Sequence, residues 1–361
     1  MTATWYAHDR DRSWTCAGPS PEALAFHRTL DGYAPTPLVD LPSLASQLGV
    51  GHVLAKDESS RLGLPAFKAL GASWAIHRAL RDRAGHAPAT VVTATDGNHG
   101  RAVARFARLL GHRACIWVPD GVHPTAVQAI LDEGAEVTVV GGSYDEAVAA
   151  AARAAKGDDE VLVQDTSWDG YEQIPAWIVE GYATLFTETD AQLAEAGLAG
   201  TDLVVVPVGV GSLLQAALSH YRRIGAAPGP AVISVEPVTA ACIAPSLAAG
   251  HAVTVDTGVT VMAGLNCGTP SSLAWPYIES GLDAAVAVTD ADDVRAAHDL
   301  AALGVAAGPC GAAGLAALRL TLLGDGHEDR RAHLHVDADS TLVLVVTEGS
   351  AANPVPDLGN R

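Results

Sequence analysis

Residues 203–218, LVVVPVGVGSLLQAAL, contain the signal that decides the fold class. The apolar run at 203–206 predicts a short strand that is buried on both faces. The chain then passes through a glycine turn at 207–212 into an apolar stretch at 212–223, which predicts a helix. A strand, a glycine turn and a helix in this order are typical of α/β proteins with a largely parallel sheet.

The same alternation continues on both sides of this stretch. Further strands are predicted at 53–55, 90–93, 114–118, 136–140, 232–235 and 342–346. Further helices are predicted at 66–83, 99–110, 124–133, 144–156, 174–195, 291–303 and 311–322. We therefore expect a two-lobed α/β protein whose mostly parallel, twisted sheets are covered by helices. No linker marks a boundary, so we expect a small lobe (71–174) inserted in a large one (1–70 and 175–361).

Composition and charge indicate which kinds of molecule the protein is not expected to bind. The chain has 41 acidic and 22 basic residues and a formal net charge of −19. Because such a surface repels phosphate backbones and anionic lipid, we expect neither nucleic-acid nor membrane partners. The five cysteines are odd in number and form no C-x-x-C pair, which favours reduced thiols in a cytoplasm and no bound metal. Residues 1–30 contain no apolar core of a signal peptide, which also favours a cytoplasmic protein.

The scarcity of lysine directs attention to one residue. Only Lys56, Lys68 and Lys156 occur in the chain, and arginine supplies nearly all other positive charge. Lysine differs from arginine because it can lose its proton and form an imine. Lys68 follows Pro65-Ala66-Phe67 at a predicted helix start, among apolar neighbours that can lower its pKa. From the residues alone, a structural and a catalytic role of Lys68 both remain open.

Three motifs carry a family resemblance. Ala66-Phe67-Lys68, Asp96-Gly97-Asn98-His99-Gly100 and Gly209-Val210-Gly211-Ser212 occur in this order. Together they resemble the fold type II pyridoxal-phosphate enzymes, the group that includes the tryptophan synthase β subunit. Over about residues 20–350 the chain is similar, more narrowly, to the diaminopropionate ammonia-lyases. The stretches that carry the narrower resemblance are 33–38, 56–59, 67–68, 95–101, 164–171, 174–177, 181–185, 262–265, 267–268 and 347–349.

The resemblance implies pyridoxal 5'-phosphate as cofactor, held by Lys68 as a Schiff base. It implies that the turn Gly209, Val210, Gly211 and Ser212 binds the cofactor phosphate, since backbone N–H groups at a helix start attract the dianion. Asn98 would donate a hydrogen bond to the phenolic oxygen of the cofactor, unless it only caps a helix. Cys310 would lie beside the pyridine nitrogen, in a turn where Pro309 replaces the Glu usual in the family; its alternative is a small buried filler.

Two acidic residues bear on the substrate. The resemblance places Asp96 where dehydratases of serine and threonine carry a small neutral residue. A carboxylate there could take the Cα proton or hold a cationic β-ammonium group, and both roles suit a diamino acid. Asp165 would be a second acidic partner. The alternatives are a helix N-cap for Asp96 and a strand-end turn for Asp165.

The resemblance implies a lyase that eliminates the β-amino group of 2,3-diaminopropionate and yields pyruvate and ammonia. The catalytic residues would be Lys68, Asp96 and Asp165, the partner a small amino acid, and the assembly a homodimer. Three alternatives stay open: a serine/threonine dehydratase of the same fold, a β-replacement synthase, and a cofactor-binding regulator without turnover.

Overall fold

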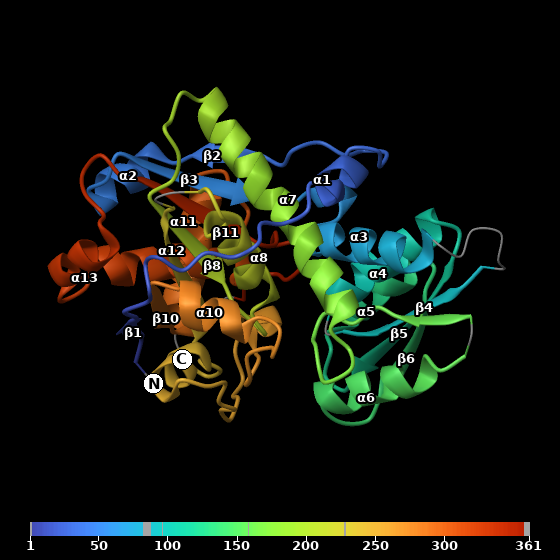
Figure 1. Cartoon of the computed structure of the whole chain (residues 1–361). Coiled ribbons are helices and arrows are strands. Elements are labelled where there is room, and N and C mark those ends of the chain that lie inside the picture. Colours follow the sequence, from blue (N-terminus) through green and yellow to red (C-terminus); the bar gives the residue numbers. More distant parts are fainter. Residues whose placement is uncertain (1, 82–87, 96, 158, 227–228, 357–361) are drawn as a thin grey trace.

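The computed structural model describes residues 2–81, 88–95, 97–157, 159–226 and 229–356. They form two lobes, each built on a largely parallel sheet with helices on both faces (Figure 1). The predicted fold class is therefore confirmed. The smaller sheet is formed by strands within residues 90–162, between strands that belong to the larger sheet. The domain limits expected from the sequence stay a prediction.

The larger sheet has seven strands in the order β1-β10-β9-β8-β11-β3-β2. Its five inner strands run parallel, and β1 and β2 are antiparallel to their neighbours at the two edges. The strands, from edge to edge, are β1 (Thr4–Ala7), β10 (Ala284–Val288), β9 (Ala231–Pro237), β8 (Leu203–Pro207), β11 (Thr341–Val346), β3 (His52–Asp57) and β2 (Leu38–Asp40). Every residue of β8, β10 and β11 is buried, as expected for strands covered on both faces.

The smaller sheet has four parallel strands in the order β6-β5-β4-β7. They are β6 (Glu136–Val140), β5 (Arg113–Pro119), β4 (Thr90–Ala94) and β7 (Glu160–Leu162). On one face, Val92 and Ala94 pack against Ala147 and Ala151 of α6 (Tyr144–Ala154). The opposite face is covered by α3 (Lys68–Leu80), α4 (Asn98–Leu109) and α5 (Pro124–Leu131) (Figure 1).

Apolar cores lie on both faces of the larger sheet. Leu203 and Val205 of β8 face one apolar core, while Val204 and Val206 face the other, as the two-residue period of a strand requires. The helices of this lobe are α1 (Glu22–His27), α2 (Pro42–Leu48), α8 (Ser212–Tyr221), α9 (Ile243–Ala249), α10 (Trp275–Gly281), α11 (Asp290–Ala302), α12 (Pro309–Leu323) and α13 (His327–Leu334). Two short 3₁₀ turns are η1 (Arg61–Gly63) and η3 (Ala263–Leu265).

The long helix α7 (Gln173–Glu195) extends from the large lobe to the small one (Figure 1). It packs against α3 at Gly181, where a Cβ would lie 2.6 Å from the carbonyl oxygen of Leu70. Only glycine permits so close an approach of the two backbones. Because α3 begins at Lys68, this contact fixes the direction in which the lysine enters the space between the lobes.

No helix in the described ranges is long and apolar enough to cross a membrane. Among the same residues, no group of three or more His, Cys, Asp or Glu side chains could hold a metal ion.

Candidate active site

The predicted site residues follow strands of both sheets, at the strands' carboxyl ends. Such ends are where α/β proteins place their ligand sites. From the large sheet, β3 leads to Lys68, β8 to the turn 209–212, and β11 to Thr347 and Glu348. From the small sheet, β4 leads to Asn98 and β7 to Asp165. The backbone ties two of these segments together, because Phe67 N donates to Thr347 O (3.0 Å) and Gly349 N donates to Pro65 O (3.0 Å).

Lys68 and Asp165 form an ion pair between the two lobes. The Lys68 ammonium lies 2.7 Å from Asp165 Oδ2. The two side chains are 24% and 11% exposed, so a small ligand can still reach the pair. Beside the ammonium, the ring centroids of Phe67 and Tyr182 lie 5.4 and 5.8 Å from Lys68 Nζ. These aromatic faces stabilise the cation and keep its surroundings apolar.

The electrostatics of this pair favour an ionised carboxylate. Burial alone would raise the pKa of Asp165, but the charge of Lys68 and the hydrogen bond from Lys68 outweigh it and hold this pKa well below its usual range. Burial lowers the pKa of His99, which leaves its imidazole neutral at neutral pH. His99 Nε2 donates to Val163 O (2.8 Å), and its Nδ1 lies 3.8 Å from Asp165 Oδ2. The Lys68 ammonium is therefore the charge that the carboxylate meets.

The glycine turn after β8 lies next to the same carboxylate. Ser212, the first residue of α8, donates from its hydroxyl to the carbonyl oxygen of Asp165 (3.2 Å). Gly211 has φ +102°, and a Cβ there would lie 3.0 Å from Ile278 Cδ1, so both conformation and space require glycine. The turn thus presents backbone N–H groups at the start of a ten-residue helix.

Asn98 and Cys310 meet at a third residue, Glu348. Asn98 Nδ2 donates to Glu348 Oε2 (2.5 Å), and the backbone N–H of Cys310 donates to Glu348 Oε1 (3.3 Å). The resemblance implies a glutamate at position 309, where this chain has proline; the structure instead brings a carboxyl to this turn from β11. Burial, followed by the neighbouring Glu348, raises the pKa of the Cys310 thiol, which therefore stays protonated.

Comparison of the sequence with known proteins identifies one family. The sequence profile of the pyridoxal-phosphate dependent enzymes matches residues 29–348. The chain belongs to the pyridoxal-phosphate dependent enzymes. It is 36% identical to the diaminopropionate ammonia-lyase of Salmonella typhimurium, over 93% of this chain and 90% of that one. Its identity to the diaminopropionate ammonia-lyase of Escherichia coli K12 is also 36%, over 91% and 87%.

A solved structure extends this likeness to three dimensions. The Escherichia coli diaminopropionate ammonia lyase, solved in complex with an aminoacrylate-PLP azomethine reaction intermediate, superposes with a TM-score of 0.89. The two chains are 33% identical, and the match covers 97% of this chain and 94% of the other. The fold is therefore that of a fold type II pyridoxal-phosphate dependent enzyme, and pyridoxal phosphate is its cofactor.

The residues of this pyridoxal-phosphate dependent enzyme fit the cofactor in two independent ways. The hydroxyl of Thr347, at the end of β11, is buried and has no hydrogen-bond partner among the described residues, so it is available to a ligand. A Cβ on Gly209 would lie 2.9 Å from Gly264 O and would fill the space beside the turn. In this pyridoxal-phosphate dependent enzyme the turn at 209–212 would hold the phosphate of the cofactor, and Lys68 and Thr347 would be its other partners.

The sequence prediction and the structure overlap incompletely. The structure brings Lys68, Asp165 and Ser212 together, and it links Asn98 to Cys310 through Glu348. Asp96 lies outside the described residues, so its predicted role stays a prediction. Sequence reasoning did not assign Thr347 or Glu348 to the site, although both directly follow the buried strand β11.

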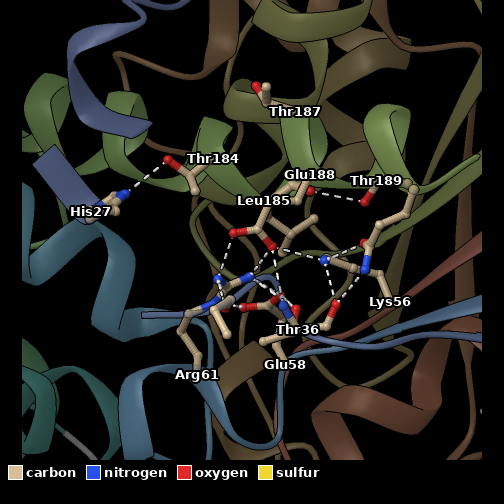
Figure 2. A network of polar contacts seen from close by, with 12 residues as sticks. His27, Thr36, Lys56, Glu58, Arg61, Thr184, Leu185, Thr187, Glu188 and Thr189 are labelled. Carbon is tan, nitrogen blue, oxygen red and sulfur yellow. Dashed lines mark hydrogen bonds and ion pairs between the residues drawn. The ribbon is translucent and has the colours of Figure 1, made fainter. Parts of the chain in front are cut away.

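This pyridoxal-phosphate dependent enzyme also contains a buried charge network, which joins the loop between β3 and α3 to α7 (Figure 2). Arg61, in the loop between β3 and Lys68, donates to both oxygens of Glu58 and both oxygens of Glu188 on α7 at 2.6–2.8 Å. Lys56 Nζ donates to Glu188 Oε2, Gln192 Oε1 and the carbonyl oxygen of Thr36, each at 2.8 Å. Two cations balance two carboxylates, and together they anchor the loop that carries Lys68 to α7.

Proposed function

We propose that this chain is a pyridoxal-phosphate-dependent lyase that eliminates the β-amino group of 2,3-diaminopropionate. The products would be pyruvate and ammonia. The observation that carries the proposal is the Lys68–Asp165 pair, in which a nearly buried carboxylate already holds an ammonium group at 2.7 Å. When Lys68 is bonded to the cofactor, the same carboxylate can accept the β-ammonium group of a diamino acid.

The chain's own residues divide the remaining work. When bound, pyridoxal phosphate supplies an electron sink for the bond that breaks at the substrate Cα. Lys68 holds the cofactor, and Gly209, Val210, Gly211 and Ser212 bind its phosphate. Asp165 orients the β-ammonium group, and Asp96 either takes the Cα proton or helps to hold that group. A serine dehydratase does not need a carboxylate at this place, because the hydroxyl group that it removes is neutral.

A substrate panel tests the proposal. The purified holoenzyme is incubated with D- and L-2,3-diaminopropionate, serine and threonine, and keto acid and ammonia are measured together. Diaminopropionate should give two ammonia molecules per pyruvate, since one leaves from Cβ and one is released on hydrolysis of the aminoacrylate. Faster turnover of serine or threonine, with one ammonia per keto acid, would instead favour the dehydratase.

The rival activities share the first half of the reaction. In a β-replacement synthase the aminoacrylate would be captured by a second nucleophile before water reaches it. Pyruvate release from diaminopropionate without any added nucleophile would argue against the synthase. Steady turnover of any kind would exclude a regulator that has lost activity.

We also propose a homodimer in the cytoplasm. The described residues contain no disulfide bond, which suits a reducing compartment. Sedimentation velocity of the holoenzyme would test the assembly, with a single species at twice the 36.9 kDa chain mass as the expected result. Fractionation of cells that express the protein would test the location.

A further inference from the structure

Glu348 connects the two lobes at the site. It is the second residue after β11 of the large sheet, and its backbone forms an antiparallel bridge with Ala66, two residues before Lys68. Its side chain accepts the hydrogen bond from Asn98 at the start of α4, in the small lobe. One residue therefore sets the position of Asn98 relative to the lysine. Neither the resemblance nor the proposed elimination gives this carboxyl a role.

The hydrogen bond to Glu348 uses only one of the two N–H groups of the Asn98 side chain. The nitrogen of an asparagine side chain carries two hydrogens, and only one can point at Glu348 Oε2. No other hydrogen bond of the Asn98 side chain is found in the part of the chain that the structure describes. Because the Glu348 carboxyl accepts from Asn98 Nδ2, it also fixes the orientation of the Asn98 amide. The amide nitrogen, not the amide oxygen, points towards Glu348.

The carboxyl of Glu348 is itself held in place. Its second oxygen accepts from the backbone N–H of Cys310, the residue after the start of α12. The residue is 4% exposed, and burial raises the pKa of its carboxyl above the usual value. Because the Glu348 side chain is buried and hydrogen-bonded at both oxygens, it is held in one orientation. It therefore holds the Asn98 amide in one orientation as well.

We propose that Glu348 is a positioning residue that holds the Asn98 amide so that its second N–H faces the phenolic oxygen of the cofactor. The inference rests on the proposed function, because it takes the cofactor on Lys68 as given. Glu348 itself touches neither substrate nor leaving group in this role. Its main effect on the cofactor passes through Asn98, while its second contact is with the backbone N–H of Cys310.

The test compares Asn98→Ala, Glu348→Ala, Glu348→Gln and the double variant Asn98→Ala/Glu348→Ala. For each, cofactor affinity and the pH midpoint of the Schiff-base absorbance band are measured. A phenolate that loses a hydrogen-bond donor holds the shared imine proton more tightly, so the midpoint should move to higher pH. Glu348→Ala should move it in the same direction as Asn98→Ala and weaken cofactor binding about tenfold, the worth of one good hydrogen bond.

The double variant separates positioning from general damage. In the Asn98→Ala background, Glu348→Ala should cause a much smaller shift than in the parent, because the residue that it mainly acts through is gone and only the contact with Cys310 is left. Glu348→Gln should give a smaller shift, since an amide oxygen still accepts from Asn98, and it carries the test if the alanine variant does not fold. The control is Glu236→Gln, the same change in a fully buried carboxyl that binds the backbone of Cys242 and Ile243.

Three outcomes would overturn the inference. The midpoint could stay at the parent value in both Glu348 variants, it could shift equally in both Asn98 backgrounds, or it could shift as much in Glu236→Gln. A parent protein that forms no Schiff-base band would overturn the proposed function itself, and the inference with it. The parent spectrum therefore distinguishes the two failures.

Discussion

The three lysines of the chain occupy three different environments. Lys56 is fully buried in the charge network, Lys156 is exposed, and Lys68 faces the space between the lobes. Borohydride reduction of the holoenzyme should therefore fix the cofactor on Lys68 alone, because only this amine can both reach the ring and lie in apolar surroundings. Peptide mass spectrometry checks the position, and a label on Lys56 or Lys156 would contradict the assignment.

Asp165 is the residue on which substrate choice should depend. Asp165→Asn keeps the size of the side chain but removes the charge that holds an ammonium group. We expect kcat/KM for diaminopropionate to fall about 10²-fold or more, the order of a lost charged partner near the reacting atoms, and that for serine to fall less. Asp169→Asn, an exposed neighbour, is the matched control. Equal losses with both substrates would show that Asp165 does not select the diamino acid.

For individual residues, the sequence predicted the residue types of the site and their motifs but not every contact between them. Lys68 could be singled out because lysine is scarce, and Asp165 because the resemblance implies an acid there. Glu348 could not, because its partner Asn98 is 250 residues away and no local pattern indicates such a contact. The orphan hydroxyl of Thr347 likewise becomes visible only when burial is known.

Among the strands, the runs rich in β-branched residues were predicted, and three short strands and one alanine-rich strand were missed. The predicted strands correspond to β3, β4, β5, β6, β8, β9 and β11. The missed strands β1, β2 and β7 have only three or four residues and include exposed positions, so no period of two could emerge. β10 reads Ala-Ala-Val-Ala-Val, and its alanines favour a helix in isolation; burial between β1 and β9 overrides that preference.

The charge network gives a prediction for the loop between β3 and α3. Arg61→Met leaves Glu58 and Glu188 buried beside each other with one cation instead of two. The free energy of unfolding should fall by about 3–5 kcal/mol, the usual cost of breaking a buried ion pair, as measured by denaturant titration. Arg295→Met breaks an exposed pair with Asp292 and should cost less than about 1 kcal/mol. A similar small loss in Arg61→Met would mean that the network does not stabilise the fold.

For the molecule as a whole, His27 makes one contribution to stability that is lost in acid. His27 is fully buried: its Nε2 donates to Leu70 O (3.0 Å), and its Nδ1 accepts from the Thr184 hydroxyl (2.8 Å). Burial lowers the pKa of His27 from 6.5 to about 4. Between these values the unfolded chain binds a proton at His27 that the folded chain does not. The contribution of His27 to stability is therefore full above pH 6.5 and falls as the pH decreases towards 4.

The measurement is the free energy of unfolding between pH 7 and pH 4.5. His27 alone should contribute a slope of about 1.4 kcal/mol per pH unit over most of this range, and His99, whose pKa is also lowered, adds to it. In His27→Gln the slope should become smaller by about that amount. His251→Gln, in an exposed position, should leave it unchanged. If the slope of unfolding free energy against pH is unaltered in His27→Gln, the proton is taken up on unfolding by a group other than His27.

The position of β11 has a consequence for how the protein is made. This strand, at residues 341–346, lies in the middle of the large sheet, between β3 (52–57) and β8 (203–207). During translation, β3 and β8 therefore leave the ribosome long before β11, the strand that lies between them. Until then their inner edges stay open, and the lysine loop lacks its hydrogen bonds to 347–349. A chain under translation thus has no complete cofactor site, and its exposed strand edges are surfaces for chaperones rather than for substrate.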